Sequence, residues 1–223
     1  MEIRKFRKNY DGLELIQASN ANIILGTLVW DPIFGKPSMD HNRMPEHITN
    51  AFVDADIISK SEMQQLIKKF KENKPVSAGF AEKTIDVDVD TITALEFPGI
   101  GDLKSEFDIK KVRKFSFGNT ECRTMTNLQR VNLDDYLEEL KKNHWKKYDG
   151  HVRRLFMITE LYYGNIEILL KNEFASELDA RLQKIKDLEL SQKTTFDKEV
   201  EYRFKHNDVP FAMRIEKVKH FNG

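Results

Sequence analysis

The residues of this sequence that could carry chemistry form small groups, and no group has the spacing of a known catalytic motif. The sequence lacks the G-x-G-x-x-G, Walker A, G-x-S-x-G and H-E-x-x-H patterns, which bind phosphates or place a nucleophile or a zinc ion. Gly99-Ile100-Gly101 is too short for a phosphate loop and predicts a tight turn between two strands. We therefore expect no enzymatic activity and no cofactor.

Asp40, His41 and His47 come closest to a metal-binding pattern. Both imidazoles would have to converge, but Pro45 lies between them and no further ligand has motif spacing. We interpret all three as polar loop residues and expect no metal. The other histidines each lie within a few residues of Lys or Arg and are predicted at the surface: His144, His151, His206 and His220.

Asp86, Asp88 and Asp90 alternate with apolar residues, which predicts three carboxylates on one face of a strand. Like charges on one face repel each other, so that face must be exposed to solvent, as one face of an antiparallel sheet often is. The same face would suit an aqueous pore lining. Cys122 has no neighbouring His or Asp in the sequence and is predicted to be a small hydrophobic strand residue.

Basic residues gather in five clusters. Each cluster is either part of a solvated face or a contact for an anionic partner such as acidic lipid. Lys and Arg number 36, as do Asp and Glu, and a dedicated nucleic-acid binder usually has a basic excess, so we expect no nucleic-acid partner. The clusters are Arg4-Lys5-Arg7-Lys8, Lys68-Lys69-Lys71, Lys110-Lys111-Arg113-Lys114, Lys141-Lys142-Lys146-Lys147 and Arg153-Arg154.

The length of 223 residues is enough to bury a core and fits one domain, which we expect to span 1–223. The single cysteine excludes a disulfide within the chain and is compatible with a reducing compartment. A transmembrane helix needs about 20 apolar residues, and the longest apolar run, 23–30, is far shorter.

The elements that must position these groups alternate between helical and extended patterns. Short strands are predicted at 13–16 and 23–30, and a short helix after Pro45. Ser59 and Glu62 have the spacing of a capping box and predict a helix that ends near Asn73. From 84 the period changes to two through Val89, and extended structure is predicted again at 107–117.

The second half of the sequence is mostly extended. A third helix is predicted from Asn132, and a strand at 152–163 that Gly164 interrupts before the alternation of 166–170. Residues 172–186 fit a strand or a helix. The alternating run 188–204 fits either one long strand or a hairpin that turns near Asp197. These patterns predict an α+β fold: a mostly antiparallel twisted sheet with about three helices packed around it.

Three stretches of this pattern resemble the pore-forming domain of the gasdermin family. Residues 154–161, Arg-Leu-Phe-Met-Ile-Thr-Glu-Leu, are similar to the family's central strand. Residues 209–215, Val-Pro-Phe-Ala-Met-Arg-Ile, are similar to its closing strand. Residues 112–140 are similar to its strand followed by a polar helix. The resemblance covers most of 13–221.

This resemblance implies a cytoplasmic protein that moves to the inner face of the cell membrane when active. There it would bind acidic membrane lipids, form a homo-oligomer and insert long β-hairpins from residues 84–117 and 155–204 as a pore in cell death or defence. An activating protease is a further implied partner. Many members carry an inhibitory C-terminal domain, whereas this sequence stops at Gly223, and the lipid-modified N-terminal cysteine of bacterial relatives has no counterpart.

The resemblance also implies roles for individual residues. The lipid-binding candidates are Arg4, Lys5, Arg7, Lys8, Lys110, Lys111, Arg113 and Lys114. The membrane-inserting candidates are Ile85, Val87, Val89, Phe107, Ile109, Phe156, Ile158, Ile166, Ile168, Leu188, Leu190, Phe196, Val200, Tyr202 and Phe204. Two alternatives stay open, a soluble binding or regulatory module without enzymatic activity and an enzyme of unrecognised type.

Overall fold

Two long antiparallel strands organise the fold. It is described from a computed structural model, which covers residues 10, 12–16, 21–30, 46–78, 84–93, 97, 99–185, 188–206 and 208–223. β5 (Val112–Thr124) and β6 (Phe156–Lys171) contain 13 and 16 residues and pair with each other. The shorter strands are β1 (Glu14–Leu15), β2 (Leu28–Val29), β3 (Val76–Ser77), β4 (Thr84–Val87), β7 (Glu189–Thr195), β8 (Glu199–Lys205) and β9 (Ala212–Lys217).

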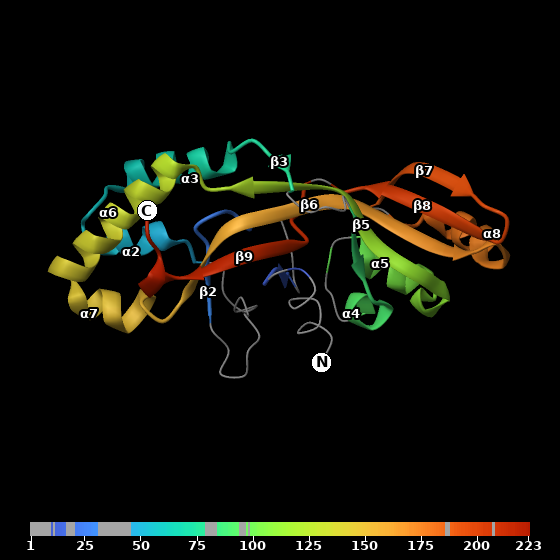
Figure 1. Ribbon diagram of the computed structural model, residues 1–223, viewed down its shortest axis with the longest axis horizontal. Helices are drawn as coiled ribbons and strands as arrows, with labels where there is room; N and C mark the ends of the chain where they lie inside the picture. Colours follow the sequence, from blue (N-terminus) through green and yellow to red (C-terminus); the bar gives the residue numbers. More distant parts are fainter. Residues whose placement is uncertain are drawn as a thin grey trace. The chain divides into compact units, whose positions relative to one another are not determined.

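Helices interrupt this strand sequence at several points, which confirms the α+β class (Figure 1). They are α2 (Ile48–Asp54), α3 (Lys60–Lys71), α4 (Val89–Thr93), α5 (Ile100–Glu106), α6 (Asn127–Asn143), α7 (Trp145–Lys147) and α8 (Asn172–Leu182). Short 3-10 turns lie at Ile109–Lys111 and Val218–His220, and a π-helical turn at Tyr148–Val152. The helices therefore outnumber the three that the sequence predicts.

The chain divides into two compact units. One unit, here called the strand unit, comprises 1–21, 76–122 and 162–212, and the other, the helical unit, comprises 22–75, 123–161 and 213–223. The core of the strand unit is formed by alternate residues of its strands, among them Phe115, Phe117, Ile168, Tyr202 and Phe204, all almost fully buried. Phe117 stacks on Phe211 with ring centroids 4.0 Å apart.

The core of the helical unit lies between α2, α3 and α6. Phe52 of α2 packs on Tyr136 of α6 with ring centroids 5.4 Å apart, and Leu133, Leu137 and Leu140 present the apolar face of α6. Local sequence explains both longer helices. Ser59 and Glu62 form the predicted capping box of α3, and Thr126 and Gln129 form another at α6.

Several predicted elements are wrong, and helix capping explains two of them. α6 begins at Asn127 rather than Asn132, because the Thr126 cap satisfies the first backbone amides. Val89 lies in α4 rather than in a strand, since the Asp88 carboxylate accepts the Thr91 amide at 2.8 Å and starts a helix. Asp86 and Asp88 therefore do not share a strand face.

Gly99 lies in a turn, as predicted, but this turn leads into α5 instead of joining two strands, and the predicted strand at Phe107 is wrong. Gly99 has φ +79° and precedes α5, a conformation that favours glycine. Phe107 ends α5 and Ile109 lies in a 3-10 turn, so the extended structure begins only at Val112. β6 runs through Gly164 without the predicted break. Residues 172–182, which fit either state, form α8 around the buried Leu178.

The alternating run 188–204 is a hairpin and not one strand. β7 and β8 pair antiparallel, with Leu190 opposite Phe204 and Thr195 opposite Val200. The turn is held by Asn172, whose side-chain amide donates to the carbonyls of Phe196 and Asp197 at 3.2 and 3.0 Å. The turn near Asp197 is therefore fixed by a residue of α8.

Candidate functional site

The two segments that the family resemblance singles out share one construction. In residues 84–117, β4 and β5 pair antiparallel, with Ile85 opposite Phe117, and α4 and α5 are inserted between them. In residues 155–204, β6 and β8 pair antiparallel, with Ile168 opposite Tyr202, and α8 and β7 are inserted between them. Each segment is thus an antiparallel strand pair whose two strands are connected through helical structure.

The β6–β8 pair has one apolar face and one charged face. Ile166, Ile168 and Leu170 oppose Phe204, Tyr202 and Val200, and all six are buried in the core. On the other face Glu167 opposes Arg203 and Lys171 opposes Glu199. This division follows from the two-residue period of strands.

The core of the strand unit contains most of the membrane-inserting candidates. Those buried in this core are Ile85, Val87, Phe107, Ile109, Ile166, Ile168, Leu188, Val200, Tyr202 and Phe204. Ile158 is buried in the helical unit, whereas Phe156 and Val89 are partly buried. Leu190 and Phe196 differ from these buried candidates, because 41% and 50% of their surface is exposed. These two side chains are the candidates that already face solvent.

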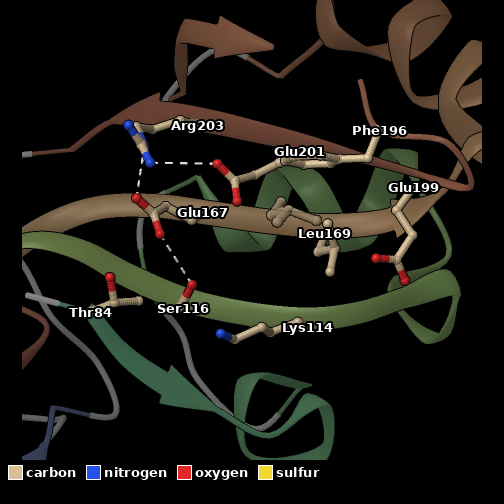
Figure 2. A pocket seen from close by; sticks show the side chains of 10 residues that line it. Thr84, Lys114, Ser116, Glu167, Leu169, Phe196, Glu199, Glu201 and Arg203 are labelled. Atoms are coloured by element: carbon tan, nitrogen blue, oxygen red, sulfur yellow. Dashed lines mark hydrogen bonds and ion pairs between the residues drawn. The ribbon is translucent and has the colours of Figure 1, made fainter. Parts of the chain in front are cut away.

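A cleft of about 460 Å³ lies on the charged face (Figure 2). Figure 2 shows side chains from β5, β6 and β8 pointing into it, with Phe196 at one end. Charged side chains of both signs are half of its lining. The lining residues are Thr84, Lys114, Ser116, Glu167, Ile168, Leu169, Phe196, Glu199, Glu201 and Arg203. Because Lys114 and Ser116 belong to segment 84–117 and the lining residues of β6 and β8 belong to segment 155–204, the cleft follows the boundary between the two segments.

Glu167 is the most buried charge of the cleft. Its carboxylate lies 2.7 Å from Arg203 Nε and 3.4 Å from the Ser116 hydroxyl, and 10% of the side chain is exposed. The same guanidinium reaches Glu201 at 3.5 Å. A buried carboxylate needs such a partner, since an unpaired charge is costly to desolvate. Glu167 and Arg203 therefore form the ionic centre of the cleft.

Lys114 closes the cleft on the β5 side. Its ammonium lies 3.0 Å from the Asp86 carboxylate of β4. The bond to Asp86, followed by the charges of Glu167 and Glu201, raises the pKa of Lys114 above its ordinary value, and partial burial opposes this rise. The chemistry of the cleft is thus a network of ionised pairs, in which each carboxylate faces Lys or Arg.

Two other lipid-binding candidates are paired with carboxylates of segment 155–204. Lys111 contacts Glu177 of α8 at 2.6 Å, and Arg113 forms an ion pair with Glu199 of β8. Lys110 is exposed. Exposed pairs of this kind contribute about 0.2 to 1 kcal/mol each. Arg4, Lys5, Arg7 and Lys8 lie outside the described residues.

The helical unit carries a basic and aromatic surface that the sequence patterns show only as two separate clusters. Trp145 is 49% exposed, and the Arg153 guanidinium lies 5.6 Å from its ring centroid. Glu138 pairs with Lys141 and Lys142, and Asp149 with Arg153. We call this group the Trp145 surface: Lys141, Lys142, Trp145, Lys146, Arg153 and Arg154, all exposed.

The candidate metal and nucleophile residues have structural roles where they are described. His47 is buried rather than in a polar loop. It is the N-cap of α2, with Nε2 2.8 Å from the Leu25 carbonyl and Nδ1 2.8 Å from the Thr49 hydroxyl. Cys122 is buried in β5, as predicted. Across the described ranges no group of three His, Cys, Asp or Glu could hold a metal ion, and Asp40 and His41 lie outside them.

Of the remaining histidines, which the sequence predicts at the surface, only some are exposed. His206 is 8% exposed and packs on Phe97 with ring centroids 4.6 Å apart, so its predicted surface position is wrong. His220 is exposed and His144 is partly buried. The side chain of His151 lies outside the described part of the chain.

Comparison with protein-family models finds no match for this chain, and comparison with curated proteins finds none either. The likeness to the gasdermin family therefore rests on the three sequence stretches. In the described part of the chain, no helix is both long and apolar enough to cross a bilayer.

Proposed function

We propose that this protein forms pores in membranes that contain acidic lipid, by oligomerising and straightening segments 84–117 and 155–204 into long β-hairpins. The observation that carries the proposal is the construction of the two segments. Each is already an antiparallel strand pair with alternating apolar and polar residues, and each has helical structure inserted where a longer hairpin would continue.

Strand length supports the proposal. A tilted membrane strand needs about 9 to 11 residues. β5 and β6 contain 13 and 16 residues, whereas strands of globular proteins usually contain about five or six. β6 lies wholly within segment 155–204 and already has the required length, whereas β5 is long enough but extends beyond segment 84–117, which contains only its residues 112–117.

The partner strands reach that length only if the inserted helices unwind. α8 contains 11 residues, and its N-cap side chain makes no hydrogen bond. Isolated helices of fewer than about 12 to 15 residues are marginal in water. α8 is thus maintained by its tertiary contacts, and a membrane that competes for those contacts would favour the extended state.

Leu190 and Phe196 support the straightening of β7 and β8. They have the same parity as Val200, Tyr202 and Phe204, but the turn at 196–198 separates the two groups. If 188–204 were one strand, all five side chains would lie on one face. A membrane strand needs such an apolar face toward the lipid.

Membrane attachment would use the Trp145 surface together with Arg113 and Lys114 of β5. Tryptophan favours the membrane interface, and each Lys or Arg close to an anionic leaflet gains about 1 kcal/mol. The proposal includes the inner face of the cell membrane as target, acidic lipid and further copies of the chain as partners, an activating protease, and no catalytic step.

Dye release from liposomes tests the proposal directly. We expect release by the wild-type chain to depend on the fraction of anionic lipid. Leu190→Asp and Phe196→Asp should abolish release without unfolding the protein, because both side chains are exposed before insertion. Thr195→Asp is the matched control, since Thr195 is exposed, adjacent to Phe196 and of opposite parity. Equal release from all four proteins, or none from the wild type at any lipid composition, contradicts the proposal.

A binding module without a membrane step is the second candidate function, and the cleft favours it. A volume of about 460 Å³ suits a small ligand, and the charges of Lys114, Glu201 and Arg203 could orient a polar one. A stable monomer that neither binds nor permeabilises anionic liposomes would support this candidate.

A further inference from the structure

Two ion pairs connect segment 84–117 to segment 155–204 through cations that follow one another closely in the sequence. Lys111, at the end of a 3-10 turn, contacts Glu177 of α8, and Arg113, at the start of β5, contacts Glu199 of β8. Glu177 and Glu199 stand 66 and 86 positions away from their partners. Two neighbouring cations therefore hold both the inserted helix and the returning strand of the other segment.

The surroundings of Lys111 strengthen its contact with α8. Its ammonium lies 5.3 Å from the ring centroid of Phe174 on α8 and 5.7 Å from that of Phe107. An ammonium over an aromatic face gains a further electrostatic attraction. Lys111 thus binds α8 through a carboxylate and a ring.

The same pairs are open to competition. The side chains of Arg113 and Glu177 are 54% and 42% exposed, so solvent and other anions reach them. Exposed ion pairs are weak and are screened by salt. A phosphate offers Arg the same two-oxygen partner as a carboxylate, and an anionic bilayer presents many at once.

We infer that Lys111–Glu177 and Arg113–Glu199 form a clamp that keeps the two segments together in the resting protein, and that anionic lipid opens it by binding the two cations. The inference rests on the proposed pore function and adds to it the step at which lipid is sensed. When the cations leave, Glu177 and Glu199 lose their partners in segment 84–117, so these charges no longer hold the two segments together.

Other ion pairs of the strand unit show why these two carry the inference. Lys171–Glu173 and Lys205–Glu189 stay within segment 155–204 and cannot hold the two segments together. Arg181 and Lys184 of the α8 region also reach across, to Glu106, but at 3.9 and 3.8 Å. In those longer contacts the carboxylate, not the cation, belongs to segment 84–117.

The test variant combines Glu177→Gln and Glu199→Gln, which removes both carboxylates of the clamp. The matched control combines Glu173→Gln and Glu189→Gln, which removes two carboxylates outside it. Both double variants remove two carboxylates and keep every cation, so their attraction to anionic lipid is equal. Only the first opens the clamp. We expect E177Q/E199Q to release dye about three to ten times faster than the control at a limiting fraction of phosphatidylserine. Equal rates for the two variants overturn the clamp.

Amide hydrogen exchange in solution, without lipid, separates the clamp from the pore. E177Q/E199Q should raise exchange in α8 relative to the control, because the helix loses its ion pair with Lys111 and the adjacent strand β8 loses its pair with Arg113. Glu177→Lys alone should do the same, and Lys111→Glu added to it should restore protection by reversing the pair. If the wild type never releases dye, the pore function fails while exchange still decides the clamp. Unchanged exchange in α8 refutes the clamp even if pores form.

Discussion

The carboxylate of Glu167 lies directly over the backbone of Gly118, so closely that a Cβ on Gly118 would stand 1.9 Å from Oε1. Gly118 belongs to β5 and Glu167 to β6. The absence of a side chain at 118 therefore provides the space in which Glu167 meets Arg203 at 2.7 Å. This arrangement gives the cleft its buried charge.

Gly118→Ala should lower the free energy of unfolding by about 1 to 2 kcal/mol, because Glu167 has to move away from Arg203. Denaturant unfolding of the single variants and of Gly118→Ala with Glu167→Ala measures this effect. The double variant should lose less than the sum of the single losses, since the second change removes the group that clashes. Strict additivity would show that Glu167 is not the obstacle.

Tyr202→Phe should loosen α8 and cost about 1 kcal/mol of stability. The hydroxyl of Tyr202 lies 2.8 Å from Asp179 Oδ1 and 3.1 Å from the Ala175 carbonyl oxygen, both on α8. Burial, followed by the bond to Asp179, raises the pKa of Tyr202 to about 12. Faster amide exchange in α8 with little change in β5 is the expected signature. Uniform changes in exchange across the strand unit would argue against a local role.

His47 should make the protein less stable in acid. Burial lowers the pKa of His47 from 6.5 to about 4. Between these values the unfolded chain binds more protons than the folded one, so stability falls as pH drops through this window and is constant above it. The loss is at most about 3.5 kcal/mol, since each pKa unit corresponds to about 1.4 kcal/mol.

Unfolding measured between pH 7 and pH 4 tests the role of His47. His47→Asn keeps a residue that favours the N-cap position and removes the titrating ring, so its stability should depend less on pH. His220→Asn, at an exposed position, serves as control and should keep the wild-type dependence. A wild-type slope in His47→Asn would assign the acid sensitivity to other groups.

The Trp145 surface should control binding to anionic liposomes. Lys146→Gln with Arg154→Gln removes two exposed cations and should weaken partitioning about 30-fold, at about 1 kcal/mol per charge. Lys68→Gln with Lys69→Gln changes the same charge in the last turn of α3 and is the control. Liposome co-sedimentation gives the comparison. Equal weakening by both double variants would show that net charge, rather than this surface, drives binding.

Local sequence was sufficient to predict elements that a helix cap or a regular alternation of apolar residues specifies. The Ser59 capping box predicts α3, and the alternation through Phe115 and Phe117 predicts β5. The start of α6 was predicted at Asn132 and lies at Asn127, although Thr126 and Gln129 have the same capping-box spacing as Ser59 and Glu62.

The candidate site was predictable as residue types but not as contacts. The sequence shows that Lys111, Arg113 and Lys114 are clustered cations. It cannot show that Lys111 and Arg113 meet Glu177 and Glu199, because these carboxylates reach them only after the chain has passed through β6 and back. The Trp145 surface lies nearer to prediction, since the sequence places Trp145 between two lysine pairs, but only the structure shows that its ring is exposed.

The period of two in residues 188–204 determined that these residues would be extended with an apolar face, because alternate side chains of a strand point to opposite sides. It did not determine whether the strand continues or folds back. That choice depends on Asn172, whose amide binds the carbonyls of Phe196 and Asp197 from 24 and 25 positions away. The sequence by itself thus set the α+β class and the amphipathic strands. Tertiary structure alone decided the turn, the buried Glu167 and the ion pairs between segments, because those contacts join residues that only folding brings together.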